Sequence, residues 1–417
     1  MSIKFLFKIT SFLSIAFLTS LSSHAQKIEV CNTCEVTSIS DAISKAKPGD
    51  KIIVKKGVYK EHQIIVDKPV KIIGENLPTV DGEDKGDIFQ VFADSVTIDG
   101  LKLINVGSSY TSDFAAIRLS RVKNFLIQNL ELRKIFFGIY LEKSHHGTIR
   151  NNNILGDAVN EHNSGNGIHL WYSKNVKIED NLIQKVRDGI YLEFADDCVI
   201  SNNKSIDNLR YGLHFMFSND DVYRDNIFEN NGAGVAVMFS KRIEMINNEF
   251  KYNWGTAAYG LLLKEINDAT IEHNIFEENT TGINVEGSNR ITYTKNDFKD
   301  NGTAIKVLGA CYDNIFTLNN FLYNSFDVSF NSRLNSNRFH RNYWSEYTGY
   351  DLDEDGYGDV PYRPVKLFSY VVNQIPEAII LMRSLFVDII DFSEKVSPVF
   401  TPDNLLDEEP LIRKYND

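Results

Sequence analysis

Cysteine is scarce in this chain of 417 residues, which contains only Cys31, Cys34, Cys198 and Cys311. So few cysteines exclude a fold that is held together by a disulfide framework. Cys31 and Cys34 form a CxxC motif with two interpretations. In an oxidising compartment the two thiols form a local disulfide. Alternatively, their thiolates bind a soft metal ion, copper(I) or zinc.

Basic charge is also in short supply. The chain has 44 lysine and arginine residues against 56 aspartate and glutamate residues, which gives a net charge of −12. An acidic surface repels nucleic acid and suits cations. We therefore expect no nucleic-acid partner and a capacity for cation binding.

The N-terminal apolar run falls short of the roughly 20 residues that cross a membrane as a helix. Lys4 and Lys8 form a basic region at its start, and Ser23-His24-Ala25 lies at its end. This order predicts a signal peptide over residues 1–25, with cleavage before Gln26. The mature chain is therefore expected in the periplasm.

Most of the chain repeats a unit in which a small residue is followed by an aliphatic, a variable and an aliphatic residue. Copies begin 22 to 29 residues apart, and most spacings are 22 or 23. Such units cannot bury a face alone, so they must stack on one another. The copies are 116–119, 138–141, 167–170, 189–192, 212–215, 234–237, 260–263, 282–285 and 304–307.

A second strand in each repeat ends in asparagine. Stacked asparagines can hydrogen-bond to one another and form a ladder. These asparagines recur at the same point of each repeat, which argues against a Greek-key sandwich. We therefore expect an all-β fold, a right-handed parallel β-helix of about 22 residues per rung. The expected ladder residues are Asn129, Asn153, Asn181, Asn203, Asn226, Asn248, Asn274, Asn296, Asn320 and Asn342.

The ends of this solenoid need covers. Residues 38–47 show helical spacing of apolar residues and predict an N-terminal capping helix. Residues 26–366 then form the β-helix with this cap and a closing acidic loop. Residues 367–417 form a C-terminal helical segment and a polar tail, 403–417, which we expect to be loosely held. Lengthened turns around 157–166 and before Gly260 are expected to project as a binding surface.

The closing loop carries Asp351, Asp353, Asp355 and Asp359. The Asp-x-Asp-x-Asp-Gly pattern converges carboxylates on a hard cation. We expect structural calcium here, although Tyr362 stands where an EF-hand loop has glutamate. The alternative is a solvated acidic turn.

The C-terminal segment has apolar residues at helical spacing, interrupted by Arg383, Asp388 and Asp391. These charges argue against a membrane span. The segment either packs on the solenoid or presents an apolar face to a partner. The candidate partner-binding residues are Ile379, Ile380, Leu385, Phe386, Ile389 and Ile390.

Strand alternation places the third and fifth positions of each unit on the outer face. His214 and Met216 then share a rung, Met238 stacks over Met216, and His169 lies two rungs from His214. Imidazole and thioether suit copper(I), so these four residues are candidate copper ligands. The alternative is an apolar patch that a turn or a partner covers.

The same face allows a polysaccharide-acting or carbohydrate-binding protein. Glu142 and Glu193 share a column about 9.5 Å apart at the rung spacing, the wide limit for an inverting glycosidase, with Trp171 between them. We expect no cluster of aspartate with arginine or lysine on adjacent rungs, as a lyase would need.

The segment Arg210–Ser218, read RYGLHFMFS, resembles the NosD family of nitrous oxide reductase maturation proteins. The resemblance covers essentially the whole mature chain. Further matching segments are Pro48–Asp50, Met238–Ser240, Tyr259–Leu262, Asn342–Tyr347, Asp351–Tyr362 and Arg363–Phe368.

This resemblance implies a periplasmic β-helix with repeats like those of carbohydrate-binding and sugar-hydrolysing proteins. It implies an assembly factor for copper centres, not an enzyme. The expected partners are an ABC transporter (permease and ATPase), a copper chaperone and nitrous oxide reductase. The C-terminal helices would dock on the permease, so the protein would be peripheral to the membrane. A metal-free adaptor of the same complex remains an alternative.

Overall fold

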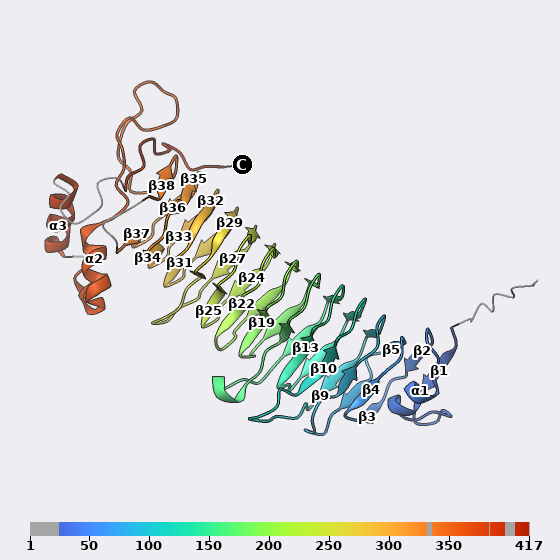
Figure 1. Cartoon of the computed structure of the whole chain (residues 1–417). Helices are drawn as coiled ribbons and strands as arrows, with labels where there is room; N and C mark the ends of the chain where they lie inside the picture. The colour runs from blue at the N-terminus through green and yellow to red at the C-terminus, as the bar shows by residue number, and fades with distance from the viewer. Residues whose placement is uncertain (1–24, 332–335, 383, 397–404, 417) are drawn as a thin grey trace, which may run out of the picture.

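The chain forms an elongated β-helix in which each turn contributes one short strand to each of three parallel sheets (Figure 1). The computed structural model describes residues 25–331, 336–382, 384–396 and 405–416. The predicted signal peptide lies almost wholly outside these residues. The predicted all-β parallel β-helix is confirmed.

Within the described residues the sheets contain 14, 13 and 12 strands, and we call them sheets A, B and C. Sheet A consists of β1 (Lys27–Val30), β2 (Lys51–Val54), β5 (Lys71–Gly74), β8 (Thr97–Asp99), β11 (Leu126–Gln128), β14 (Thr148–Arg150), β17 (Lys177–Glu179), β20 (Val199–Ser201), β23 (Val222–Arg224), β26 (Glu244–Ile246), β29 (Asn267–Glu272), β32 (Asn289–Thr294), β35 (Ile315–Thr317) and β38 (Arg338–His340).

Sheet B consists of β3 (Val58–Lys60), β6 (Thr79–Asp81), β9 (Lys102–Ile104), β12 (Glu131–Arg133), β15 (Asn153–Leu155), β18 (Leu182–Gln184), β21 (Lys204–Ile206), β24 (Ile227–Glu229), β27 (Glu249–Lys251), β30 (Ile275–Glu277), β33 (Asp297–Lys299), β36 (Asn320–Leu322) and β39 (Tyr343–Trp344). Sheet C, which carries the candidate site, consists of β4 (Ile64–Val66), β7 (Phe89–Val91), β10 (Ala115–Ser120), β13 (Phe137–Glu142), β16 (Ile168–Trp171), β19 (Asp188–Glu193), β22 (Tyr211–Met216), β25 (Ala233–Met238), β28 (Leu261–Lys264), β31 (Thr281–Glu286), β34 (Thr303–Leu308) and β37 (Phe326–Phe330).

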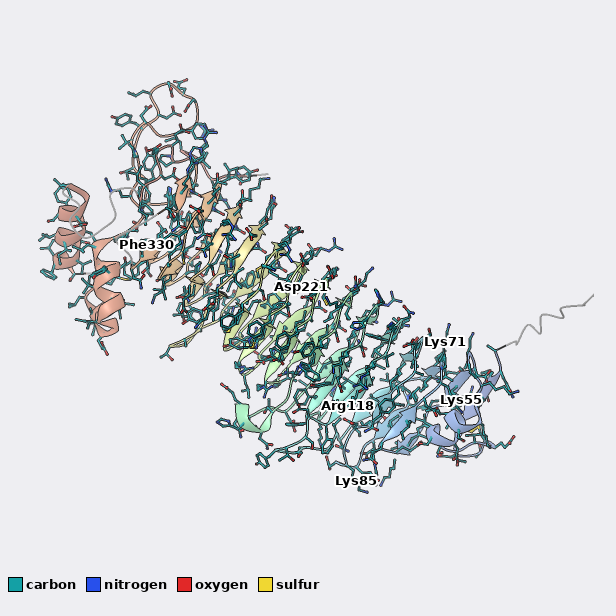
Figure 2. All side chains as sticks on the ribbon, in the orientation of Figure 1. Lys55, Lys71, Lys85, Arg118, Asp221 and Phe330 are labelled. Atoms are coloured by element: carbon teal, nitrogen blue, oxygen red, sulfur yellow. A yellow bond between two sulfur atoms is a disulfide. The ribbon has the colours of Figure 1, made fainter. Side chains whose placement is uncertain are left out.

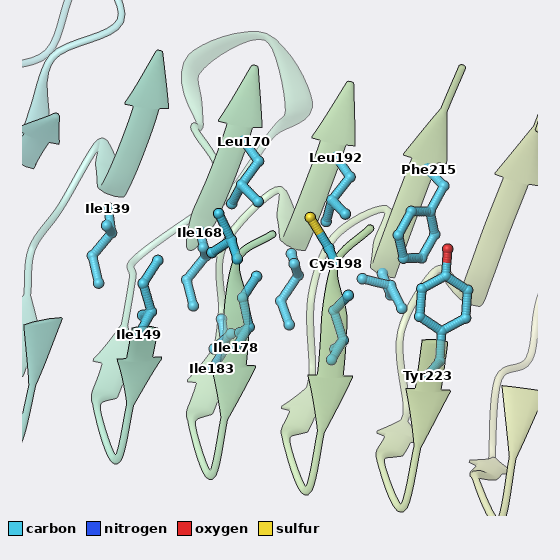
Figure 3. Close-up of a cluster of buried hydrophobic side chains, with 14 of the residues drawn as sticks. Ile139, Ile149, Ile168, Leu170, Ile178, Ile183, Leu192, Cys198, Phe215 and Tyr223 are labelled. Carbon is cyan, nitrogen blue, oxygen red and sulfur yellow. The ribbon is translucent and has the colours of Figure 1, made fainter. Parts of the chain in front are cut away.

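The core follows the predicted alternation, because the second and fourth residues of each sheet C unit point inward. Leu170, Leu192 and Phe215 occupy the fourth position of three successive rungs and are buried (Figure 3). A column of aromatic rings continues the core on sheet B, with neighbouring centroids 4.1 to 5.5 Å apart from Phe228 to Trp344. Side chains project from the rod along its whole length (Figure 2).

The asparagine ladder is present, with three corrections to its membership. Asn152 and Asn319 occupy the ladder, not Asn153 and Asn320, and Asn129 lies at an exposed turn. Each ladder amide donates from Nδ2 to the Oδ1 of the next asparagine at 2.9 to 3.0 Å. The ladder consists of Asn152, Asn181, Asn203, Asn226, Asn248, Asn274, Asn296, Asn319 and Asn342.

A second asparagine ladder runs at another corner, which the sequence analysis missed. Nδ2 lies 2.8 to 3.1 Å from the next Oδ1 at four of the links, and the backbone amide of Asn231 donates to Asn253 Oδ1 at 3.0 Å. The members of this ladder are Asn208, Asn231, Asn253, Asn279, Asn301 and Asn324. The two ladders satisfy buried backbone groups at the turns, because each amide also bonds to main-chain atoms of adjacent rungs.

The predicted N-terminal cap is helix α1 (Ile39–Lys45), and it covers the first rungs with Ile39, Ala42 and Ile43. Ser38 caps the helix by accepting a hydrogen bond from the Asp41 amide at 3.1 Å. Glu61 accepts a second one from the Ile39 amide at 2.7 Å. The exposed edge of the solenoid is therefore covered by a helix that the rungs themselves hold.

At the opposite end of the rod lie α2 (Leu367–Gln374), the short helix η2 (Pro376–Leu381) and α3 (Leu385–Val396) (Figure 1). They pack on β37 through Phe326, Phe368 and Val387, which are buried together. Asp391 of α3 accepts a hydrogen bond from the Phe368 amide at 3.0 Å, which ties α3 to α2. The predicted C-terminal helices are thus present.

The tail, which we expected to be loosely held, returns to the solenoid where it is described. Asp407 is fully buried, and bridges pair it with Phe339 and Tyr362. Lys414 forms an ion pair with Asp297 at 2.7 Å, and Tyr415 bonds to Asn320. The prediction failed because polar composition does not reveal a partner more than sixty residues away.

Asp407 ends the first asparagine ladder. Its carboxylate accepts hydrogen bonds from the Arg341 and Asn342 amides, from Asn342 Nδ2 and from Trp344 Nε1, at 2.9 to 3.1 Å. A ladder of amides leaves one donor unpaired at its end, and here a carboxylate, which only accepts, receives it.

We predict that Asp407→Ala lowers the free energy of unfolding by about 3 kcal/mol or more, because buried donors lose their acceptor. Urea denaturation of the variant and the wild type measures the difference. Glu408→Ala, at the exposed neighbouring position, is the control. Equal midpoints for all three proteins would contradict this role.

Candidate metal site on the outer face of sheet C

The predicted outer columns of sheet C are in the expected register. His169 pairs with Tyr191, which pairs with His214, so the two histidines lie two rungs apart. Met216 pairs directly with Met238. The structure therefore brings His214, Met216 and Met238 to one place on the solenoid.

These outward side chains are largely buried, which the sequence did not indicate. His169 and His214 are 7% and 6% exposed. Their rings belong to a continuous stack with Tyr140 and Tyr191, in which neighbouring centroids lie 4.5 to 4.7 Å apart. Tyr211 adds a further ring beside His214 at 4.8 Å. Aromatic stacking on the outside of the sheet thus makes a second, local apolar layer.

His169 is a stacking residue in this layer. Its Nδ1 lies 3.3 Å from the Asn166 side-chain amide, whereas Nε2 has no hydrogen-bond partner among the described residues. Burial, with the nearby charge of Arg187, lowers the pKa of His169 to about 3. The imidazole is therefore neutral at every physiological pH.

A buried acid–base cluster adjoins His214. Asp188, fully buried at the start of β19, accepts a hydrogen bond on Oδ1 from Arg210 Nε at 2.8 Å and a second on Oδ2 from a terminal nitrogen of that guanidinium. Burial alone would raise the pKa of Asp188, but the hydrogen bonds and charge of Arg210 outweigh it and lower this pKa to about 2. Asp188 is therefore an anion.

This cluster corrects one expectation, because Asp188 and Arg210 do form an aspartate–arginine pair on adjacent rungs. It does not resemble a lyase centre, since a fully buried carboxylate cannot contact a polymer. The pair could have been found from sequence. Asp188 lies one residue before Gly189 and Arg210 lies two residues before Gly212, at positions that the alternation argument left out.

His214 lies between this cluster and the thioethers. Its Nδ1 is 3.8 Å from Asp188 Oδ2, longer than a hydrogen bond, and Nε2 has no hydrogen-bond partner among the described residues. Burial raises the pKa of Tyr191 to about 12, so its hydroxyl keeps its proton and lies 3.7 Å from Met216 Sδ. Met216 and Met238 are half-buried.

The residues present fit a copper(I) ion. A buried ring nitrogen without a partner is costly unless something binds it. Two neighbouring thioethers and one imidazole form a soft donor set, and such sets select copper(I). His169 does not fit as well, since the ring of Tyr191 lies between it and His214.

A partly exposed stack of rings borders the thioether column. Tyr172, Phe194, Phe217 and Phe239 follow the fifth position on four successive rungs, with centroids 4.6 to 5.1 Å apart. Tyr172 and Phe217 are exposed by 44% and 39%. The methionines therefore sit at the rim of an apolar surface strip, not in open solvent.

The residues of the alternative polysaccharide site also lie in one column. Glu142 pairs with Trp171 on the next strand, and Trp171 pairs with Glu193 on the strand after it. The Lys143 ammonium lies 5.4 Å from the centre of the Trp171 ring. One face of the tryptophan that would stack on a sugar is thus next to a cation of the protein itself.

The other predicted metal ligands divide into two groups. Cys31 and Cys34 form a disulfide, the alternative to metal binding, and bonded sulfurs are not thiolates. In the closing loop, the carboxylates of Asp351, Asp353 and Asp355 lie within 4.8 Å of one another. The charge of Asp355 raises the pKa of Asp353.

Asp359 lies apart from this group and accepts the Leu352 amide at 2.7 Å. Asp351 accepts the amides of Asp355 and Gly356. These bonds shape the loop, and calcium binding stays a prediction.

The C-terminal helices expose most of the predicted partner-binding residues. Ile380 is 86% exposed, and Ile379, Leu385, Phe386 and Ile389 are exposed by 53 to 74%, whereas Ile390 is half-buried. Among the described residues, no helix has the length and hydrophobicity needed to cross a bilayer. An apolar face of this extent on short helices is typical of an interaction surface.

Fold and site together define an all-β binding scaffold, a β-helix that presents one buried imidazole and two thioethers on an outer face. Residues 153–349, which include these three side chains, match the family described as "Periplasmic copper-binding protein (NosD)". Over this segment the chain is similar to the NosD family.

Two relatives extend the similarity to most of the chain, and each is named "Probable ABC transporter binding protein NosD". The protein from Pseudomonas aeruginosa is 27% identical over 404 residues, covering 84% of this chain and 85% of its own. The one from Stutzerimonas stutzeri is 27% identical over 368 residues, covering 84% of each. Both names describe binding proteins, not enzymes.

Solved structures share the fold alone. The Dettilon tailspike protein matches with a TM-score of 0.59 and 15% identity, over 75% of this chain and 70% of its own. DFA-IIIase from Arthrobacter chlorophenolicus A6 matches with a TM-score of 0.54 and 13% identity, over 76% and 99%.

We predict that acid destabilises this outer layer through His169. The folded protein binds the proton only near pH 3, whereas the unfolded chain binds it near pH 6.5. Stability due to neutral His169 is therefore complete above pH 6.5 and falls as pH drops towards 3, by up to about 1.4 kcal/mol per pH unit. Thermal denaturation from pH 7 to pH 4 should show a shallower loss for His169→Phe.

His146→Gln, at an exposed histidine, is the control and should keep the wild-type slope. If His169→Phe lost stability with the same slope as the wild type, the buried histidine would not be the acid-sensitive group.

Proposed function

We propose that this protein is an exported scaffold that accepts copper(I) and passes it on during maturation of the copper centres of nitrous oxide reductase. The observation that carries the proposal is the buried imidazole of His214, whose Nε2 has no hydrogen-bond partner among the described residues, beside the thioethers of Met216 and Met238. Copper is cargo here, so moderate affinity and access from the surface suit the task.

The ligand types and their placement support transfer. Met216 and Met238 are half-buried at the rim and His214 is buried behind them, so an ion from a donor would meet thioether before imidazole. The Tyr191 hydroxyl, 3.7 Å from Met216 Sδ, gives that sulfur a weak partner that an ion can displace. Asp188, whose Oδ2 lies 3.8 Å from His214 Nδ1, places a negative charge beside this ligand.

The partners would lie at two places on the rod. A periplasmic copper chaperone and the reductase would meet the rim of sheet C. The permease of an ABC transporter with its ATPase would bind the exposed apolar face of η2 and α3. The names of both relatives as transporter binding proteins support this, and the helices are packed on the solenoid by Phe368 and Val387, which leaves that face outward.

We predict that Met216→Leu together with Met238→Leu weakens copper(I) binding at least tenfold, and that adding His214→Asn reduces it to background. Leucine keeps the volume of methionine and removes the sulfur, so folding should be little affected. Competition with a chromophoric copper(I) chelator under anaerobic conditions measures the affinity.

Met382→Leu, between η2 and α3, is the matched control for sulfur loss elsewhere. Unchanged affinity in the triple variant would reject these ligands. A wild-type protein that binds no copper(I) but still co-purifies with the transporter would instead show a metal-free adaptor.

We further predict that Ile380→Asp combined with Phe386→Asp abolishes co-purification with the transporter in detergent, because burying two carboxylates in an apolar interface is costly. Both side chains are exposed, so the fold and copper(I) affinity should not change. Ile65→Asp, at a residue 53% exposed near the other end of the rod, is the control. Transporter binding by the double variant at the wild-type level would contradict the docking site.

A further inference from the structure

Asp188 is a fully buried carboxylate on the rung that precedes His214. It pairs in register with Tyr211, the first residue of β22, and thus lies towards the start of the strand from His214. Met216 lies two residues beyond His214 in the opposite direction along the same strand. The imidazole is therefore placed between a buried anion and a thioether.

Both oxygens of this carboxylate are oriented by Arg210. Its guanidinium bonds to Oδ1 from Nε and to Oδ2 from a terminal nitrogen, which is the two-point geometry that arginine makes with carboxylates. Arg187 Nε adds a more distant positive charge at 4.0 Å from Oδ2. The carboxylate therefore has a set direction and cannot turn away from His214.

The imidazole is held in place as well. The rings of Tyr191 and Tyr211 lie 4.6 and 4.8 Å from its centre, and the residue is 6% exposed. In this position Nδ1 is the nitrogen that faces Asp188 Oδ2, at 3.8 Å. Neither ring nitrogen has a hydrogen-bond partner among the described residues, so the Asp188 carboxylate acts on Nδ1 through its charge.

We propose that Asp188 is a positioning residue that selects the tautomer of His214, with the proton on Nδ1 and the lone pair on Nε2. The physical reason is that an anionic oxygen attracts the N–H and repels a lone pair, so the proton is more stable on the nitrogen that faces it. Carboxylates that orient metal-binding histidines in this way also increase their basicity towards the metal.

This inference rests on the proposed function only for its second consequence, copper affinity. The tautomer itself is a property of the metal-free protein. Asp188, oriented by Arg210, would make His214 ready to bind an ion through Nε2 before any ion arrives. The RYGLH segment and Asp188 would then form one unit that spans two rungs.

The test uses the full mature chain, labelled with nitrogen-15, without metal. Long-range nitrogen–proton correlation spectra distinguish a protonated ring nitrogen from one with a lone pair. In the wild type, His214 should show a single tautomer with the proton on Nδ1. In Asp188→Asn the spectrum should move to a mixture of tautomers or to the proton on Nε2.

Copper(I) affinity, measured by chelator competition, should fall by about 10- to 100-fold in Asp188→Asn, with both methionines intact. Asp220→Asn is the matched control, because Asp220 and Arg242 form the same two-point pair on adjacent rungs at an exposed site. This control should keep the wild-type tautomer and affinity.

Asp188→Asn leaves Arg210 without its anion and can unfold the region. The double variant Asp188→Asn with Arg210→Gln removes both charges, which proteins tolerate better than removing one. It should show the same change of tautomer.

A wild-type tautomer with the proton on Nε2, or a tautomer that is unchanged in both Asp188 variants, would overturn the role of Asp188 whatever the copper result. A changed tautomer with copper affinity within twofold of the wild type would overturn the link to the metal. A different result would contradict the proposed function itself: equal copper(I) affinity in the wild type and in His214→Asn.

Discussion

The structure depends on hydrogen bonding between equivalent positions of successive rungs. Each short strand pairs in parallel with the strand one turn earlier and the strand one turn later, and the asparagine ladders repeat this pairing through side chains. Any residue therefore has as neighbours the residues about 22 positions before and after it. Substituting the small residue of a unit shows how tight this contact is, since a Cβ on Gly138 would lie 2.3 Å from the Gly167 carbonyl oxygen.

This constraint also decides what must happen at the ends and on the outside. A stack of rungs has two open edges, one covered by α1 and the other closed by Asp407 and the C-terminal helices. On the outside, side chains in one column touch each other as closely as those inside. The column of Tyr140, His169, Tyr191 and His214 consequently buries itself by stacking, and the site gains a low-polarity environment without an interior cavity.

The repeat and its alternation predicted the fold, the inward and outward sets, and the registers of His169, His214, Met216 and Met238. The asparagine assignments were less exact, because pairs such as Asn152-Asn153 and Asn319-Asn320 do not reveal which member enters the ladder. The second ladder was visible in retrospect. Its residues follow the first at a constant offset of five, as in Asn203 and Asn208 or Asn226 and Asn231.

The sequence alone determined which residues share a column, because in a parallel β-helix the column follows from spacing and the face from parity. It therefore brought two thioethers and an imidazole together on one face. Only the tertiary structure decided that His214 is buried beside Asp188 and Arg210, and that Asp407 returns to the last rung. The burial of His214 depends on how the rings stack, and the position of Asp407 depends on how the tail folds back. Neither kind of contact follows the repeat of the sequence.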